Sequence, residues 1–550
     1  MFWALLQTAK VVKCSHSTTI GNSHRPIRLC KEGKAVKQIS NRPRISRRCE
    51  ESAVRTLFSA AVVVVLATCG AKAQTLGIFG HSSDVGMVTR AGSAQFLQDA
   101  NEYRITGGGA NIWGEKDAFG YLWSDVSGDL SLTAKIQWIG EGKNPHRKAG
   151  WMVRQSLAAD APYADAVVHG DGLTSLQFRR IAGGATEEVQ SPISAPAFIR
   201  LERRADVFSL YVSKDGRAYQ PVGSVCIPLQ EPVLAGLAVC SHDDTVRETA
   251  VFCDVKTKSL GTFETKDRVV ESSLETIAIE TGQRQTVYRS RTHFEAPNWS
   301  VDGKYLLFNS GGRLYTVGLS GGEPKQLDTG FADRCNNDHG FSPGGRMLAI
   351  SHHREGKSLI YVLPSEGGTP RLVTEQGPSY WHGWSPNGKT LTYCAERNGN
   401  YDIYTIAARG GPETRLTEAE GLDDGPDYSP DGRYIYFNSE RTGAMRIWRM
   451  NSDGADPVQI TNDDSYMDWF PHPSPDGKWI VFLSYDKRVT GHPAHKEVVL
   501  RIMPTTAAAK PRVIARLFGG QGTINVPSWS PESSSIAFVS YRLVGKGSQD

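Results

Sequence analysis

Six related segments follow one another in the second half of the chain, and they restrict the fold more than any other feature. Each places a serine, in most copies a proline, and a turn-forming pair ahead of a hydrophobic run. The spacings are 42, 43, 44, 45 and 56 residues between the repeated serines, which are Ser300, Ser342, Ser385, Ser429, Ser474 and Ser530. A period just above forty residues, with four strand-sized pieces in each repeat, is typical of β-propeller blades.

One repeat can be interpreted strand by strand. The residues around the serine end a short inner strand, and the glycine of an Asp-Gly or Asn-Gly pair supplies the backbone freedom that a tight turn needs. An alternating strand such as 434–439 follows, then a third strand such as 446–452, a hairpin turn and a fourth strand. Each blade buries an aromatic-rich face against its neighbour, so we expect no blade to be stable alone.

The two ends of the repeat region complement each other. The sixth copy contains an inner strand and one further strand, whereas residues 274–290 have the pattern of a third and a fourth strand. We therefore predict an all-β propeller of six blades over residues 274–550, in which the earlier segment completes the last blade. The Gly-x-Ser-x-Gly match at 318–322 lies at a hairpin position of its repeat, so Ser320 is interpreted as a turn residue.

The repeats are similar to those of a known family. "SPDGKWIVF", "DIYTIAARGGPETRLT" and "RIWRMNSDG" resemble the WD-like repeats of TolB propellers, and the resemblance covers about residues 270–550. It implies the architecture, and it implies a protein-interaction scaffold of the kind that TolB-like propellers form in cell-envelope complexes. Because propellers carry many unrelated activities, the resemblance specifies the fold more narrowly than the function.

Residues 76–255 alternate short β runs with turns and show no long helical pattern. This pattern is typical of a two-sheet β-sandwich of jelly-roll type, followed by a polar linker at 256–273. Stretches such as "KAGWMVRQSLAADAPYADAVVHGDG" resemble a bacterial family of concanavalin-like jelly rolls, which implies carbohydrate binding. By residue type alone the candidates for sugar contacts are Trp113, Trp123, Trp138, Tyr163, Asp165 and His169, although a hydrophobic core is the simpler explanation for the tryptophans.

The loops that enter the inner strands of the propeller carry polar residues that turn chemistry does not require. They are Glu295, Asn298, Asn337, Asp338, His339, His382, Asp424, Asp427, Asp468, His472 and Asn525. Two interpretations are open. Either these side chains satisfy backbone groups at a hydrated channel mouth, or they converge on a ligand. In the second case His339, His382 and His472 would suit a divalent metal ion.

One resemblance bears on this metal interpretation. "DWFPHPSPDG" is similar to the histidine-bearing entry of oligogalacturonate lyases, which implies a metal-dependent polysaccharide lyase. Two departures weaken it, because those enzymes have seven blades and carry a second, closely spaced histidine that is absent here. No residue of this chain is assigned a catalytic role, and if the protein is an enzyme we expect a carbohydrate-active lyase.

The charge of the chain is unevenly distributed. The formal net charge is +4, but residues 1–73 contribute +10, so residues 74–550 carry −6. A mildly acidic body gives no electrostatic reason to expect a nucleic-acid partner. Residues 55–73 have the pattern of a signal peptide cleaved after Ala73, with lipidation at Cys69 as the alternative, and residues 1–54 are interpreted as a leader ahead of the true translation start.

These observations predict an exported, periplasmic or secreted protein without a stable membrane span. An N-terminal jelly-roll sandwich would precede a six-bladed propeller. The predicted function is binding of a glycan or another cell-envelope component through the jelly roll, the propeller mouth or both. The alternatives are a protein-interaction scaffold of TolB type and a metal-dependent polysaccharide lyase.

Overall fold

The computed structural model describes residues 75–140, 142, 144–506 and 509–548. In these residues β-strands and turns dominate, and the helical elements are the short 3-10 turns η2 (Thr265–Asp267) and η3 (Gln521–Thr523). The predicted leader at 1–54 and the predicted signal peptide at 55–73, including Cys69 and Ala73, lie outside the described residues. The prediction of an all-β chain is confirmed.

The first part of the chain forms two antiparallel sheets of seven strands each. In spatial order, the first sheet contains β1 (His81–Val85), β6 (Phe119–Val126), β15 (Val233–Cys240), β8 (Lys148–Arg154), β9 (Tyr163–His169), β10 (Thr174–Arg179) and β11 (Glu187–Gln190). The second contains β14 (Gln220–Cys226), β13 (Val207–Ser213), β12 (Phe198–Arg204), β7 (Asp129–Ile139), β16 (Glu248–Gly261), β3 (Glu102–Gly107) and β2 (Ser93–Leu97).

A hydrophobic core joins the inner faces of the two sheets. Trp151 and Phe178 of the first sheet and Leu201 and Phe208 of the second belong to one buried cluster. Along these strands, side chains that point into the core between the sheets alternate with side chains that point away from it, as expected for a two-layer β-sandwich. A small hairpin of β4 (Ile112–Trp113) and β5 (Lys116–Asp117) adds a separate two-stranded element.

The segment that we expected to be a linker, 256–273, is mostly strand. β16 continues to Gly261 because its second half pairs with β7 at residues 129–133. β17 (Arg268–Ala278) starts before the predicted position because it pairs with β39 (Ser535–Gly545) along its whole length. The connection between the two strands is therefore reduced to residues 262–267, which include η2.

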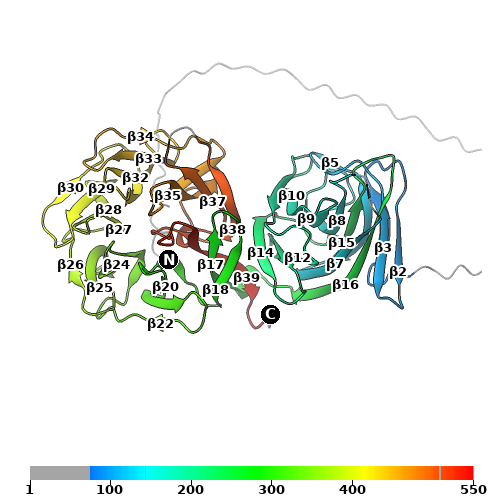
Figure 1. Ribbon diagram of the computed structural model, residues 1–550, viewed down its shortest axis with the longest axis horizontal. Helices are drawn as coiled ribbons and strands as arrows, with labels where there is room; N and C mark the ends of the chain where they lie inside the picture. The colour runs from blue at the N-terminus through cyan, green and yellow to red at the C-terminus, as the bar shows by residue number, and fades with distance from the viewer. Residues whose placement is uncertain (1–74, 141, 143, 507–508, 549–550) are drawn as a thin grey trace, which may run out of the picture. The chain divides into compact units, whose positions relative to one another are not determined.

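The second part of the chain forms the predicted six-bladed propeller, visible as a ring of small sheets in Figure 1. The first three four-stranded blades are β19 (Glu295–Trp299), β20 (Tyr305–Ser310), β21 (Arg313–Gly318) and β22 (Lys325–Gln326); β23 (Cys335–Phe341), β24 (Met347–Arg354), β25 (Lys357–Pro364) and β26 (Arg371–Leu372); and β27 (Ser379–Trp384), β28 (Thr390–Arg397), β29 (Asn400–Ala407) and β30 (Glu413–Arg415). The next two are β31 (Asp423–Tyr428), β32 (Tyr434–Ser439), β33 (Arg446–Asn451) and β34 (Val458–Gln459); and β35 (Tyr466–Pro473), β36 (Trp479–Asp486), β37 (Lys496–Pro504) and β38 (Arg512–Gly519).

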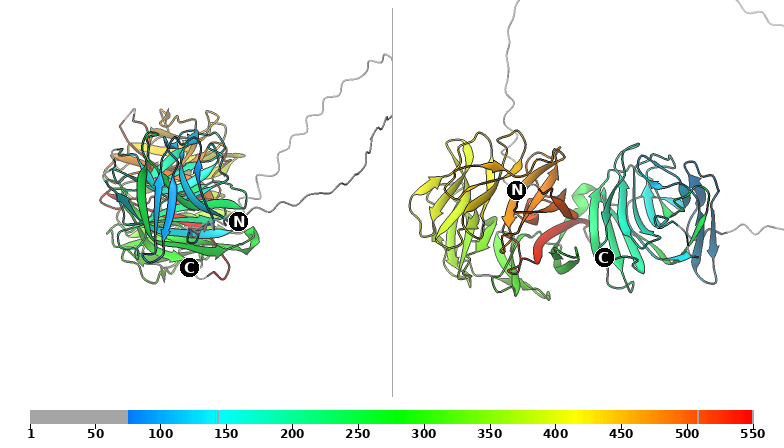
Figure 2. Two further views of the ribbon diagram at one scale, coloured as in Figure 1. Left: turned by 90° about the vertical axis from the view of Figure 1, so that its right-hand side faces the viewer. Right: turned by 45° about the horizontal axis from the view of Figure 1, so that its top comes forward.

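The sixth blade is built from both ends of the propeller sequence, as predicted. β39 pairs with β17, and β17 pairs with β18 (Arg284–Ser290), so residues from before the first repeat complete the last one. An isolated bridge between Trp529 and Ile536 marks the inner edge of this blade. In Figures 1 and 2 the red β39 lies beside the green β17.

The repeated serine explains why the turn between the inner and second strands is the same in every blade. In all six blades its Oγ accepts a hydrogen bond from the backbone N–H five residues later, for example Ser429 from Tyr434 at 2.9 Å and Ser474 from Trp479 at 3.0 Å. The turn glycine adopts positive φ, as at Gly432, where φ is 72°. Ser320 also lies in a hairpin turn, which is closed by a hydrogen bond from Gly321 N–H to Gly318 O.

Candidate functional site

A cavity of about 500 Å³ lies at the end of the propeller channel where the inner strands finish. Its wall is built from the repeat itself. The position before the repeated serine supplies Trp299, Phe341, Trp384, Tyr428, Pro473 and Trp529, and the position after it supplies Val301, Pro343, Pro386, Pro430, Pro475 and Pro531. We call these twelve residues the aromatic–proline collar. Rigid rings and prolines lose little conformational freedom on binding, which favours a preformed site.

Hydrogen bonds hold two of the collar tryptophans in place. Trp384 Nε1 donates to Gly340 O at 3.1 Å, and Trp529 Nε1 donates to His472 O at 2.9 Å. Beneath them, Trp381 packs against the backbone of Gly340, where an added Cβ would lie 2.2 Å from the indole. These contacts fix two of the collar tryptophans to the backbone of neighbouring blades.

Asp427 is the only charged residue that lines this cavity. His472 Nδ1 lies 3.1 Å from Asp427 Oδ2, while His472 Nε2 lies 3.0 Å from the carbonyl oxygen of Ile524. Because a carbonyl oxygen only accepts, the contact with Ile524 requires a proton on Nε2. Burial raises the pKa of Asp427, and the hydrogen bond from His472 opposes this effect.

Most of the polar residues that we predicted at the channel connect one blade to another. His382 Nε2 contacts Asp424 Oδ1 at 3.1 Å, Asn525 Nδ2 donates to Asp338 Oδ1 at 2.9 Å, and Asn298 Nδ2 donates to Pro527 O at 2.7 Å. Each contact crosses from one blade to another. Of the predicted set, only Asn298 and Asp427 also line the cavity.

The three predicted metal ligands do not meet. His382 contacts Asp424, His472 contacts Asp427, and neither ring nitrogen of buried His339 has a hydrogen bond of normal geometry. Burial lowers the pKa of His339 to about 3, so its imidazole is neutral. In the part of the chain that the structure describes, no three His, Cys, Asp or Glu side chains are placed to share a metal ion. The geometry therefore gives no support to the metal-dependent lyase interpretation.

The other predicted channel residues have separate surroundings. Asp468 Oδ1 accepts from Ser484 Oγ at 2.6 Å and from Arg501 at 3.3 Å, so it lies within its own blade. Asn337 is buried, and half-buried Glu295 contacts His293 at 3.5 Å. These contacts fit structural roles.

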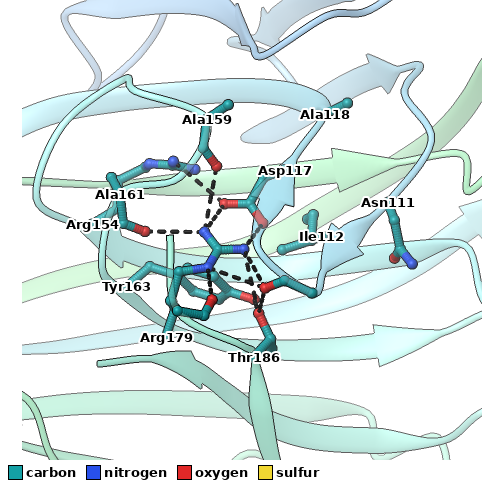
Figure 3. A network of polar contacts seen from close by, with 12 residues as sticks. Asn111, Ile112, Asp117, Ala118, Arg154, Ala159, Ala161, Tyr163, Arg179 and Thr186 are labelled. Carbon is teal, nitrogen blue, oxygen red and sulfur yellow. Dashed lines mark hydrogen bonds and ion pairs between the residues drawn. The ribbon is translucent and has the colours of Figure 1, made fainter. Parts of the chain in front are cut away.

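In the sandwich, the β4–β5 hairpin covers the outer face of the first sheet. Figure 3 shows Arg179 and Arg154 pointing toward the carboxylate of Asp117. Arg179 donates to both Asp117 oxygens at 2.7 and 2.8 Å, and Arg154 lies 3.5 Å away. All three side chains are fully buried, so this pairing fixes the hairpin against the sheet.

This hairpin changes the interpretation of the predicted sugar contacts. Tyr163 and Asp165 are fully buried on the covered face, and Tyr163 bonds Thr186 at 3.2 Å, so neither is open to a sugar. Buried His169 contacts Gln177, and Trp138 packs on the core. Trp113, at the hairpin, is 38% exposed, while half-buried Trp123 stacks on His81. The six residues do not form one surface.

Sequence reasoning looked for the site at the opposite end of the inner strands from this cavity. It treated the aromatic residues beside each repeated serine as blade architecture and looked for chemistry among the loop residues that differ between blades. The signal that was available is the aromatic side chain that recurs directly before the serine, together with the proline after it. In a ring of blades, a side chain that is repeated at the end of the inner strand lies at the same opening in each blade that carries it.

The ring of blades, with an aromatic opening at one end, defines this molecule as a six-bladed β-propeller. The family described as the TolB β-propeller domain matches residues 382–503. A protein of Agrobacterium fabrum is 54% identical over 274 residues, which cover 50% of this chain and 93% of the relative. The chain belongs to the family of TolB-like β-propeller proteins.

Other matches are more distant or more partial. The Tol-Pal system protein TolB of Francisella tularensis subsp. mediasiatica is 28% identical over 208 residues, 35% of this chain and 46% of that protein. A solved structure, provisionally named TolB, from Agrobacterium tumefaciens has 53% identity, covers 50% of this chain and 99% of its own, and gives a TM-score of 0.48. The chain thus spans about half the length of the Francisella protein.

Proposed function

We propose that this protein is a binding scaffold that holds a segment of a protein partner in the aromatic–proline collar. The observation that carries the proposal is the collar itself, a fixed and mostly apolar cavity with one carboxylate at its wall. Concave, preformed sites of this composition, with few polar groups, are typical of ligand-binding surfaces. A propeller of binding-scaffold type needs no catalytic group, which agrees with the structural roles of the channel histidines.

Two further observations support a protein partner. Aromatic residues dominate the energetically important positions of protein interfaces, and the collar presents five of them from five different blades. The Francisella relative is named as a component of the Tol-Pal system, which favours a role in an assembly for the family.

The experiment is selection of peptides from a random display library on the full chain, followed by measurement of their affinity for variants. We expect the selected peptides to bind Trp384→Ala and Trp529→Ala at least tenfold more weakly, because each change removes an aromatic side chain from the wall of the cavity that holds the peptide. Trp113→Ala, a change at an exposed tryptophan of the sandwich, is the control. Peptides that bind both collar variants as tightly as the unaltered protein would refute the proposal.

A glycan ligand is the second candidate function, and one feature of the collar favours it. Trp299, Phe341 and Tyr428 are only partly buried, so they leave aromatic surface open to the cavity. A glycan array probed with the full chain tests this alternative. Binding that Trp384→Ala abolishes would favour a glycan, whereas an array without signal, together with library peptides in the collar, would favour the protein partner.

We also propose that the protein is exported. The proposal rests on the signal-peptide pattern of residues 55–73. Separately, no helix in the described part of the chain has the length and apolar character to cross a membrane. N-terminal sequencing of the protein from the native host is expected to start at Gln74. A chain that retains residues 55–73 would contradict this proposal.

A further inference from the structure

We infer that the partner's anchor in the collar is a basic side chain, lysine or arginine, whose cation lies between the aromatic rings and Asp427. This inference rests on the proposed function, because it specifies the chemistry of the segment that the same cavity binds. It follows from the charge, the ring chemistry and the orientation of one carboxylate.

The charge on the cavity wall is negative. Nineteen residues line it, and Asp427 is the only one among them with a charged side chain. No lysine or arginine lines the wall to offset that carboxylate. His472 contacts one oxygen of that carboxylate, and a basic anchor would add a positive charge at the cavity wall, which a neutral apolar anchor does not supply.

The aromatic residues favour the same ligand. Indole and phenol rings carry negative potential on their faces, and they attract a lysine ammonium or an arginine guanidinium that lies over them. Tyr428 is adjacent to Asp427 in the chain, and Trp384 comes from the neighbouring blade. Aromatic walls and a carboxylate together form a cage for a cation, whereas an anionic anchor would meet repulsion from both.

The carboxylate is held at the cavity wall by its neighbours. The hydrogen bond from His472 uses Oδ2. The other oxygen, Oδ1, lies against Gly383 of the adjacent blade, where an added Cβ would be 3.0 Å away, so the glycine leaves room for the carboxylate. His472 in turn is fixed by its contact with Ile524 O, so the carboxylate is positioned before a ligand arrives.

The test uses random peptides displayed against the full-length protein, with selection repeated on Asp427→Asn. We expect one lysine or arginine position in the peptides selected on the unaltered protein, and loss of that preference with Asp427→Asn. Replacing this residue by norleucine, which keeps the length and removes the charge, is expected to weaken binding at least tenfold. Asp453→Asn removes the same charge from an exposed hairpin turn outside the cavity and serves as the control.

The outcomes separate the two proposals. Peptides that require Trp384 and Trp529 but show no basic preference would overturn the inference and leave the proposed function intact. A selection that yields no collar-dependent peptide would overturn both. Because the norleucine substitution is made in the peptide, the test remains decisive even if Asp427→Asn weakens the fold.

Discussion

At the scale of single residues, the same polar side chains that mark the channel in the sequence act mainly between blades. Residue type alone does not distinguish a histidine that binds a metal ion from a histidine that forms a hydrogen bond with a neighbouring carboxylate. His472 shows this limit. The sequence predicted that it is more than a turn residue, but only the structure shows that it contacts Asp427 and Ile524.

Asp338 provides a prediction at this scale. Burial raises its pKa to about 7, with His382 lowering it and Asp424 and Glu295 raising it further. Between the ordinary pKa of an aspartate and about 7, the folded state keeps a proton that the unfolded state has lost. The free energy of unfolding therefore falls with rising pH, by at most about 1.4 kcal/mol per unit.

Urea unfolding of the unaltered protein and of Asp338→Asn, measured from pH 4 to pH 8, checks this expectation. The stability of the unaltered protein relative to Asp338→Asn should be greatest near pH 4 and should decline toward pH 8. A difference between the two proteins that does not vary with pH would show that Asp338 ionises normally in the folded protein.

At the scale of elements, the sequence was most informative where a pattern repeats. The alternating strands of the propeller and the long strands of the sandwich lie close to their predicted positions, because alternation of apolar residues reports which face is buried. The β4–β5 hairpin was missed, since two-residue strands carry no periodicity. The burial of Tyr163 and Asp165 on the face that this hairpin covers was therefore not predicted either.

The hairpin depends on one carboxylate, which gives a prediction for Asp117→Ala. Removing Asp117 leaves Arg154 and Arg179 buried without their shared counter-charge, and loss of one partner from a buried pair costs about 3–5 kcal/mol. Denaturant unfolding should show this loss. Glu115→Ala, an exposed change in the same hairpin, is expected to change stability by less than about 0.5 kcal/mol. Equal stability of the two variants would mean that the buried pairing does not hold the hairpin.

At the scale of the whole molecule, closure of the ring was predictable because the first and last repeats are complementary. The cavity was not predicted, because the residues on either side of each repeated serine were interpreted as blade architecture and not as one wall shared by six blades. The closing sheet contains a buried ion pair, in which Arg284 contacts Glu275 at 2.7 Å, and Ser540 of β39 also bonds Glu275.

Glu275→Ala is therefore expected to weaken the joint between β17, β18 and β39. The change leaves Arg284 buried and unpaired, at a cost of about 3–5 kcal/mol, and thermal unfolding should show a lower midpoint. Limited proteolysis should also cut the closing sheet more readily. Glu280→Ala, an exposed change in the turn that follows β17, is the matched control. A midpoint equal to that of the control would show that this ion pair does not contribute to closure.

The most direct measurement of the central claim is a crystal structure of the full chain with a library-selected peptide. The account predicts the peptide in the collar, in contact with Trp384, Tyr428 and Trp529, with a basic side chain directed at Asp427. A peptide bound to the sandwich, or to the outer strands of the blades with the collar empty, would contradict it.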